Sequence, residues 1–378
     1  MIMKKKLTVR IALLIVCALN INTTFAQDVR QKPVIKKQTT TTTKKQTPAS
    51  TKKKTSTKKH QTTTPKWTDQ LYYSEGLAIV VDANGKFGYI DKTGKFVIPG
   101  QWKVAYDFSE GLAAVKDDND KWGFIDKTGQ VVIPCKWNWA SEFSEGLAEV
   151  QDANENWGYI DKTGRIVISC KWKEAWTFRD GLAVVGDFNG KWGFIDKTGK
   201  VVIPCKWKRA WWFNEGLAVV GDFNDKYGFI DKTGQVVIPC KWEGAGSFSD
   251  GLAAVKDPND RVGFIDKTGQ IVIPCQWIGA GSFSEGLAAV QDDNGKCGFI
   301  DKTGKLVIPC KWNWAGDFYK GLAAVKKSNG KWGFIDKKGK VVISCQWKFA
   351  YSFHEGLAVV RDANGKYGYI DKTGKVVK

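Results

Sequence analysis

The sequence predicts an all-β protein whose main part is a tandem array of nine 35-residue repeats. Two series of glycines define the repeat, one in an E-G-L-A motif and the other in a W-G-F-I-D motif. Both series advance by 35 residues without insertion or deletion, at Gly76, Gly111, Gly146, Gly181, Gly216, Gly251, Gly286, Gly321 and Gly356, and at Gly88, Gly123, Gly158, Gly193, Gly228, Gly263, Gly298, Gly333 and Gly368. A period of about 20–50 residues is typical of solenoids, propellers and related arrays. Any function has to be built from this repeated unit.

Each unit predicts three β-strands and a connector. In the second copy, Leu112–Lys116 and Trp122–Asp126 are apolar runs separated by a turn signal rich in Asp and Asn. The D-K-T-G sequence that follows predicts a tight hairpin with a bulge, because Asp opens type I turns and Gly adopts the left-handed conformation that ends them. A third strand, rich in Val and Ile, ends at Trp137. Residues 138–146 then link this unit to the next.

Two arrangements of these units fit the sequence. In the first, which we favour, three-stranded β-meanders stack into an open superhelix, or solenoid, with exposed ends. In the alternative, the units close radially into a β-propeller-like ring, and the connector supplies a fourth strand to each blade. The open array is favoured because propeller blades usually contain about 40–50 residues and usually number about four to eight.

The composition divides the chain into three parts. Residues 1–26 combine a positively charged start, an apolar core at 11–19 and a small-x-small site ending at Ala26, which predicts a cleaved secretory signal peptide. This core is shorter than the ~20 residues needed to cross a bilayer, so no transmembrane anchor is predicted. Residues 27–66 are rich in Lys and Thr, have little to bury, and predict a disordered linker. Residues 67–378 contain the nine repeats.

The formal net charge of +19 belongs mainly to the N-terminal parts of the chain. Residues 1–26 carry +4 and residues 27–66 carry +11, whereas residues 67–378 carry only +4. Specific binding to nucleic acid requires a concentrated basic face, so the repeat region is not expected to bind it. The linker is expected to act as a solvated spacer, and its polycationic character would also let it contact anionic surfaces.

Seven cysteines recur at one position of the repeat. They are Cys135, Cys170, Cys205, Cys240, Cys275, Cys310 and Cys345. The alternation I-P-C-K-W places each Cys on the same strand face as the following Trp, as expected for a small, partly buried apolar side chain. The alternative is a column of disulfides between neighbouring repeats, which would suit an exported protein and requires Cα atoms within about 7 Å. A single repeated Cys lacks the paired spacing of a zinc site, and no metal is predicted.

Two motifs connect the repeat to a known family. The sequence K-W-G-F-I-D-K-T-G at 121–129 and the sequence F-S-E-G-L-A at 143–148 recur in most copies. With them the chain, over residues 67–378, resembles the WG-containing β repeat family of bacterial proteins. The resemblance implies an interaction module without a common chemistry. The chain departs from the pattern at the residue before the second glycine, at Phe87, Tyr227, Val262, Cys297 and Tyr367.

Catalytic and cofactor chemistry have little support in the sequence. The chain contains only His60 and His354, so neither a Ser-His-Asp arrangement nor a His-rich metal site can be assembled. Carboxylates recur in every unit, but identical copies cannot all converge on one pocket. The D-A-N-G sequence at 82–85 is similar to the start of a calcium loop, but the later ligands of such a loop are missing. We therefore predict no enzymatic activity and no cofactor.

The candidate binding residues lie in the connector, where the sequence varies while the surrounding frame stays constant. One connector position is Ala in all eight copies from Ala105 to Ala350 and is expected to pack inside. The positions beside it accept Trp, Glu, Arg and Gly, which is not expected for a core position. The predicted ligand- or partner-binding residues are Trp139, Trp176, Trp211, Trp212 and Trp314, with Phe188 and Phe223 at two neighbouring hairpin tips. Exposed rings of this kind bury a large area at low entropic cost, although they can instead fold back over neighbouring repeats.

These observations predict an exported, non-catalytic scaffold that binds a protein or peptide at the cell envelope. The predicted location is the periplasm, the cell surface or the medium. The alternative function is a carbohydrate- or cell-wall-binding module that uses the same connector aromatics to bind glycans.

Overall fold

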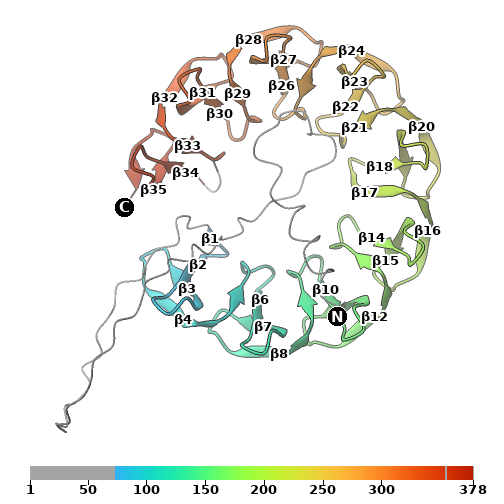
Figure 1. Cartoon of the computed structure of the whole chain (residues 1–378), viewed down its shortest axis with the longest axis vertical. Helices are drawn as coiled ribbons and strands as arrows, with labels where there is room; N and C mark the ends of the chain where they lie inside the picture. The colour runs from blue at the N-terminus through green and yellow to red at the C-terminus, as the bar shows by residue number, and fades with distance from the viewer. Residues whose placement is uncertain (1–72, 354–355, 378) are drawn as a thin grey trace, which may run out of the picture.

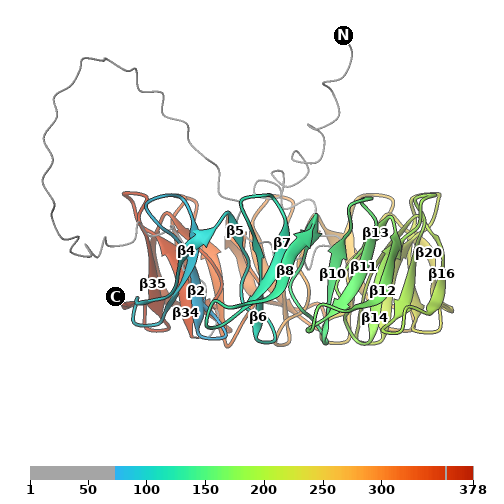
Figure 2. The same ribbon diagram turned by 90° about the horizontal axis from the view of Figure 1, so that it is seen from below.

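The computed structural model describes residues 73–353 and 356–377, which form nine four-stranded antiparallel sheets. The sheets follow one another around a ring as the blades of a β-propeller (Figure 1). From the side, the ring is a disc whose strands run between its two faces (Figure 2). The predicted signal peptide, the predicted linker and the first residues of the predicted repeat domain lie outside the described residues.

Within each blade the strands lie in chain order from the centre of the ring outward (Figure 1). The innermost strands are β1 (Tyr73–Ser74), β5 (Val104–Ala105), β9 (Trp139–Ala140), β13 (Glu174–Ala175), β17 (Arg209–Asn214), β21 (Gly244–Ala245), β25 (Gly279–Ala280), β29 (Trp314–Ala315) and β33 (Phe349–Ala350). The second strands are β2 (Leu77–Val81), β6 (Leu112–Lys116), β10 (Leu147–Gln151), β14 (Leu182–Gly186), β18 (Leu217–Gly221), β22 (Ala253–Lys256), β26 (Leu287–Gln291), β30 (Leu322–Lys326) and β34 (Leu357–Arg361).

The two remaining strands of each blade include the W-G-F-I-D motif and the cysteine position. The third strands are β3 (Phe87–Asp91), β7 (Trp122–Asp126), β11 (Trp157–Asp161), β15 (Trp192–Asp196), β19 (Tyr227–Asp231), β23 (Val262–Ile265), β27 (Cys297–Asp301), β31 (Trp332–Asp336) and β35 (Tyr367–Asp371). The outer strands are β4 (Phe96–Trp102), β8 (Val131–Trp137), β12 (Ile166–Trp172), β16 (Val201–Trp207), β20 (Val236–Trp242), β24 (Ile271–Trp277), β28 (Leu306–Trp312), β32 (Val341–Trp347) and β36 (Val376–Val377). We number the blades 1 to 9 in chain order.

The predicted open superhelix of three-stranded units is wrong, and the ring that we considered as the alternative is the observed architecture. The fourth strand comes from the connector, where Val104 and Ala105 pair antiparallel with Lys116 and Val115. A blade fits into 35 residues because most inner strands are only two residues long. In addition, a single residue, Asn138, carries the chain from the outer strand β8 to the next inner strand β9.

The glycine of the W-G-F-I-D motif is required by a bulge in the outer strand. Between β7 and β8, Phe124 pairs with Ile133 but Trp122 pairs with Trp137, so the outer strand has two extra residues at this point. The bulge brings the outer backbone close to Gly123, where an added Cβ would lie 2.5 Å from the Ile133 carbonyl oxygen. Any side chain at this position would therefore clash with backbone.

The D-K-T-G hairpin turn has the geometry predicted from the sequence. The amide of Gly129 donates to the Asp126 carbonyl oxygen at 3.0 Å, and Gly129 has a positive φ of 88°. The Asp126 carboxylate accepts hydrogen bonds from the amides of Thr128 and Gln130. These hydrogen bonds explain the repeated Asp and Gly by the backbone of the turn.

The hydrophobic core is divided into clusters that lie between adjacent blades. Between blades 2 and 3, Trp122 and Phe124 of β7 pack against Ala140 and Phe143 of the next blade. The rings of Phe124 and Phe143 have centroids 4.8 Å apart, and equivalent pairs recur between later blades. Clusters of this kind join each blade to the next from blade 1 to blade 9, as in other repeat proteins.

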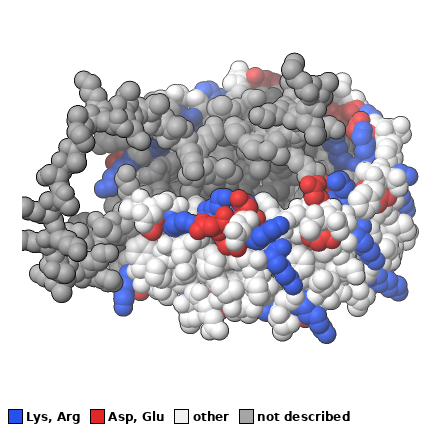
Figure 3. Space-filling model, turned by 60° about the horizontal axis from the view of Figure 1, so that its bottom comes forward, with Lys and Arg blue, Asp and Glu red and all other residues white. Residues whose placement is uncertain are grey.

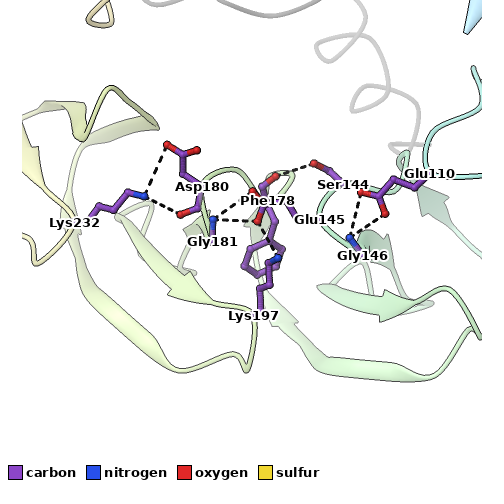
Figure 4. A network of polar contacts seen from close by, with 9 residues as sticks. All are labelled: Glu110, Ser144, Glu145, Gly146, Phe178, Asp180, Gly181, Lys197 and Lys232. Atoms are coloured by element: carbon purple, nitrogen blue, oxygen red, sulfur yellow. Dashed lines mark hydrogen bonds and ion pairs between the residues drawn. The ribbon is translucent and has the colours of Figure 1, made fainter. Parts of the chain in front are cut away.

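Polar contacts on one face of the ring also join adjacent blades (Figure 4). The Glu145 carboxylate accepts a hydrogen bond from the Gly181 amide at 3.0 Å and pairs with Lys197 at 3.1 Å. The Ser144 hydroxyl group donates to the carbonyl oxygen of Phe178 at 3.0 Å. We call the contacts of Glu145 with Gly181 and Lys197 the interblade staple, and they recur with Glu75, Glu110, Glu215 and Glu285 in place of Glu145.

The part of the ring seen in Figure 3 shows no single dominant charge. In Figure 3, acidic and basic side chains lie side by side on the face toward the viewer. This mixture agrees with the small net charge of the repeat region. Within the described parts of the chain, no helix is long and apolar enough to cross a membrane.

Candidate functional site

The variable connector positions lie on the innermost strands of the ring. Trp139 begins β9, Glu174 begins β13 and Arg209 begins β17, so these residues occupy equivalent positions in blades 3, 4 and 5. The invariant alanine beside them packs into the core between blades, as predicted, and Ala140 is fully buried. In each inner strand, the alanine is therefore held in the core, while the residue type at the positions beside it varies from blade to blade.

The aromatic residues at these positions form a strip that crosses several blades. On blades 2 and 3, the Trp139 ring lies 5.3 Å from Trp122 and 6.2 Å from Tyr106, measured between centroids. On blades 4 and 5, Trp176 lies 5.3 Å from Trp192 and 4.7 Å from Trp212. Together with Trp157, which lies between these two groups, we call the set the aromatic strip: Tyr106, Trp122, Trp139, Trp157, Trp176, Trp192 and Trp212.

A pocket of about 410 Å³ interrupts the strip between blades 3 and 4. We call it the blade 3–4 pocket, and its lining consists of Trp139, Glu149, Gln151, Trp157, Glu174, Ala175 and Trp176. In blade 3, Trp139 stacks on Trp122 of blade 2. The equivalent residue of blade 4 is Glu174, which has no ring to stack on Trp157 of blade 3, and the pocket occupies the space that is left. Across the described residues, no aromatic ring stacks on Trp157 in the way that Trp139 stacks on Trp122.

Glu149 is the most unusual residue of the pocket. It lies on β10 and is 7% exposed, which makes it the one buried charged residue in the described chain. Its Oε1 atom accepts a hydrogen bond from the Thr177 hydroxyl at 3.0 Å, whereas its Oε2 atom is buried without a partner among the described residues. Burial raises the pKa of this carboxyl group above its ordinary value of 4.5, although the Ser141 and Thr177 hydroxyl groups partly offset the effect.

The sequence-predicted binding residues are only partly brought together. Trp139, Trp176 and Trp212 belong to the strip, and Trp139 is 40% exposed. Trp211 lies beside Trp212 on β17 and packs at 5.7 Å from Tyr227. Trp139 and Trp212 stack on rings of the preceding blade, Trp211 stacks on a ring of its own blade, and all of them keep part of their surface accessible.

The remaining predicted residues lie elsewhere. Phe188 and Phe223 are at the tips of the β14–β15 and β18–β19 turns and are 66% and 58% exposed. Trp314 begins β29 on blade 8, away from blades 3–5 (Figure 1), and belongs to a separate group with Trp332 and Phe349. Trp314 is therefore not part of the strip.

Sequence reasoning missed Glu149, Gln151 and Trp157 as site residues. The signal for Glu149 was present, because its equivalents in the other copies are all small or β-branched apolar residues: Ile79, Ala114, Val184, Val219, Ala254, Ala289, Ala324 and Val359. A single carboxylate in such a column points to a special site. Trp157 was not informative by itself, since three other copies also have Trp at its position.

The repeated cysteines are not brought together by the fold. Cys170 packs against the core between blades 2 and 3, whereas Cys205 packs against the core between blades 3 and 4. Consecutive thiols thus lie on different sides of a blade, and all eight cysteines of the described chain are free thiols. Burial raises the pKa of the Cys170 thiol to about 11, so the thiolate form is disfavoured at neutral pH.

Other polar clusters serve the turns. The Asp82 carboxylate, which begins the D-A-N-G sequence, accepts hydrogen bonds from the amides of Asn84 and Lys86 at 2.9 Å. Within residues 73–353 and 356–377, no group of three or more His, Cys, Asp or Glu residues has the arrangement of a metal site.

A ring of nine four-stranded blades defines the class of this protein as a β-propeller. The family model described as "WG containing repeat" matches residues 87–122, 122–155, 157–192, 192–227, 227–257, 263–297, 298–332 and 332–367. These matches cover most of the chain, which therefore belongs to the WG-containing repeat family. No curated protein matches the chain.

The ring is also similar to solved structures, at low sequence identity. The computationally designed Ika8 protein is 12% identical, with 82% of this chain and 98% of that chain covered and a TM-score of 0.42. BamB from Moraxella catarrhalis is 11% identical, with 80% and 96% covered and a TM-score of 0.41. Sqt1 from Saccharomyces cerevisiae is 11% identical, with 69% and 92% covered and a TM-score of 0.40. Such similarities carry no information about ligands.

Proposed function

We propose that this chain is an exported, non-catalytic propeller that binds a protein or peptide with the inner rim of blades 2–5. The observation that supports this function best is the aromatic strip. Four of its rings (Tyr106, Trp139, Trp176 and Trp212) stand at connector positions that vary between copies, and the other three stand at the Trp position of the W-G-F-I-D motif. Partly exposed rings held by stacking can bury large area on a partner at low entropic cost.

The structural roles of the recurring carboxylates in residues 73–353 and 356–377 favour binding over catalysis. The carboxylates that recur in each blade are engaged in turns and interblade staples, as Asp126 and Glu145 illustrate. The sequence of residues 1–26 supports export, and the Lys/Thr-rich residues 27–66 would act as a spacer between the ring and its surroundings.

The test is affinity capture from envelope fractions with the full chain and with the double variant Trp176→Ala, Trp211→Ala. A captured protein is then purified, and its Kd for both forms of the ring is measured. Loss of a tryptophan at a binding interface commonly weakens affinity by more than 1 kcal/mol, so we expect at least about a tenfold increase in Kd for the double variant. Phe349→Ala on blade 9 serves as the matched control, because it removes a stacked inner-strand ring outside the strip. Equal affinity of all three proteins would contradict the proposal.

A second function, glycan binding, is favoured by the composition of the blade 3–4 pocket. The pocket combines indole rings with the side chains of Gln151 and Glu174, and sugars are bound by such pairs of flat apolar faces and hydrogen-bonding groups. Titration with cell-wall glycans would then quench or shift the tryptophan fluorescence, and the Trp176→Ala, Trp211→Ala variant would lose the response. An unchanged emission spectrum together with a specific captured protein would rule this function out.

A further inference from the structure

The blade 3–4 pocket has the features of a site for a positive charge. We propose that it holds the cationic head group of a lysine or arginine side chain from a bound peptide. This inference rests on the proposed peptide-binding function, and it identifies the chemical group that the pocket selects. Three observations support it: the buried carboxylate, the tryptophan walls, and the cations that the same ring places over equivalent aromatic residues.

The first observation is the buried carboxylate of Glu149. Glu149 lines the pocket, and its Oε2 atom is buried and has no hydrogen-bond partner among the described residues, because the Ser141 hydroxyl beside it donates to the Glu142 carbonyl oxygen. A buried, unpaired carboxylate oxygen is costly, and an ammonium or guanidinium group would supply both a hydrogen bond and an opposite charge. The pocket lining contains a second carboxylate, Glu174, and no Lys or Arg side chain.

The tryptophan walls suit the same group. Trp139, Trp157 and Trp176 line the pocket, and the faces of indole rings attract cations through their quadrupoles. The alkyl stem of a lysine or arginine would pack against these rings, while its charged end would reach Glu149. A neutral apolar side chain would fill the same space but would leave Oε2 unpaired.

The propeller itself shows that a cation fits against the ring at the position of Trp157. In blade 8, the Lys326 ammonium group lies 5.7 Å from the centre of the Trp332 ring, and in blade 9 the Arg361 guanidinium group lies 5.2 Å from the Tyr367 ring. Trp332 and Tyr367 are the equivalents of Trp157, and Lys326 and Arg361 are the equivalents of Gln151. Blade 3 therefore keeps the ring but replaces its own cation with a neutral side chain.

The experiment compares short peptides that differ at one side chain, titrated into the full chain and followed by ligand-observed NMR. The peptides carry lysine, arginine, norleucine or citrulline at the central position. We expect the lysine and arginine peptides to bind at least about tenfold more tightly than their neutral counterparts, given the strength of desolvated cation–π and charge-assisted contacts. Equal binding of the lysine and norleucine peptides, or no binding of the lysine peptide, would overturn the proposal.

The variants use residues that the ring already accepts at the same positions. Glu149→Ala introduces the residue found in blades 2, 6, 7 and 8, and Trp157→Val introduces the residue found at Val262 in blade 6. Both should abolish the preference for lysine over norleucine, and circular dichroism should confirm that the ring is folded. Glu155→Gln removes an exposed charge from the neighbouring turn and should leave the preference unchanged. Retention of the preference in Glu149→Ala would contradict the assignment.

Two further comparisons separate this inference from its alternatives. Glucosamine carries an ammonium group where N-acetylglucosamine has a neutral acetamide group. Binding of glucosamine that is tighter than that of both N-acetylglucosamine and the lysine peptide would assign the pocket to an amino sugar and overturn the peptide assignment. Trp211→Ala lies outside the pocket lining. If Trp211→Ala weakens the affinity for the captured partner while Glu149→Ala does not, the proposed function is supported and the assignment of the pocket to a cationic side chain is wrong.

Discussion

At the scale of single residues, the main feature is that one carboxylate lies in a column of apolar side chains. Glu149 replaces Ala, Val or Ile in a strand that is otherwise buried, and only one of its oxygen atoms has a described partner. An unpaired buried polar atom reduces stability unless another component compensates for it. Residues that reduce the stability of the fold in this way are expected at binding sites.

The stability of the ring should report the burial of Glu149 through its pH dependence. Because burial raises the pKa of Glu149 above 4.5 in the folded state, the folded protein holds the proton more tightly than the unfolded chain. This contribution to stability is complete below pH 4.5 and is lost as the pH rises through the folded-state pKa. Glu149→Gln cannot ionise, so its unfolding temperature should increase relative to that of the native protein as the pH rises from 4.5.

Thermal unfolding measured across this pH range would check the prediction. Glu155→Gln is the control, because Glu155 is exposed and its replacement should give a difference that does not depend on pH in this way. A temperature difference between Glu149→Gln and the native protein that stays constant with pH would show that the native carboxyl group is not protonated on burial.

The sequence located the variable aromatic positions but not the pocket that they surround. Trp139 and Trp176 were predicted because a position that also accepts Gly or Arg is not a core position. Glu149 lies on a neighbouring strand of the same blade, and only the pairing of β9 with β10 brings it near Trp139. Glu149 comes near Trp176 only through the packing of blade 3 against blade 4. The periodicity of a single sequence does not reveal that packing.

At the scale of structural elements, the blade depends on a close contact between its third and outer strands. The bulge in β8 lets the chain turn toward the next blade, and the glycine opposite it leaves room for the displaced backbone. The local turns were predictable because Asp, Thr and Gly determine them within a few residues. The inner strand was missed because it contains only two residues and forms through pairing rather than through its own sequence pattern.

The glycine opposite the bulge should tolerate no side chain. Gly123→Ala would place a Cβ atom 2.5 Å from the Ile133 carbonyl oxygen and 2.7 Å from the Cys135 amide nitrogen. Because both atoms belong to the backbone, relief requires the bulge to move, and we expect a loss of about 1–3 kcal/mol or more. A reduced unfolding temperature would confirm this expectation.

Blade 9 provides the matched control for this substitution. An added Cβ at Gly368, the equivalent glycine, would meet nothing within 4 Å, and this glycine does not have a positive φ. Gly368→Ala should therefore leave the unfolding temperature nearly unchanged. Equal destabilisation by the two substitutions would show that the glycine is needed for another reason than the close approach of the outer strand.

At the scale of the whole molecule, the ring is a series of similar interfaces between adjacent blades, which we call joints. The 35-residue period predicted the number of units and their boundaries, but the same period is compatible with a stacked array and with a ring. The relative rotation of neighbouring blades decides between them, and that rotation depends on the interblade cores and staples rather than on any residue pattern within one unit. The shortness of the unit was a misleading argument against a propeller, because a two-residue inner strand suffices.

The joints differ in strength, and the joint between blades 8 and 9 lacks part of its staple. Lys320 stands where other joints have Glu or Asp, and the Lys372 ammonium group lies 3.4 Å from the Lys320 carbonyl oxygen instead of pairing with a carboxylate. Blade 9 is also less buried, since Leu357, Val359 and Tyr369 are partly exposed whereas their equivalents in blade 7 are buried. In a repeat protein, stability is approximately a sum of such nearest-neighbour terms.

We therefore expect local opening to begin at blade 9, and hydrogen exchange should show it. Amides of β34 and β35 should exchange faster than those of β26 and β27. Lys320→Glu should restore the staple with Lys372, slow exchange in blade 9, and stabilise it by about 0.5–1 kcal/mol at low salt, with a smaller effect at high salt because the pair is exposed.

The double variant Glu285→Lys, Lys320→Glu is the control, because it leaves the net charge unchanged while it removes the staple between blades 7 and 8, where Glu285 pairs with Lys337 at 3.0 Å. If the staple determines the strength of a joint, fast exchange should move from blade 9 toward the joint between blades 7 and 8. Unchanged exchange in both places would show that apolar packing alone sets the order in which the blades open.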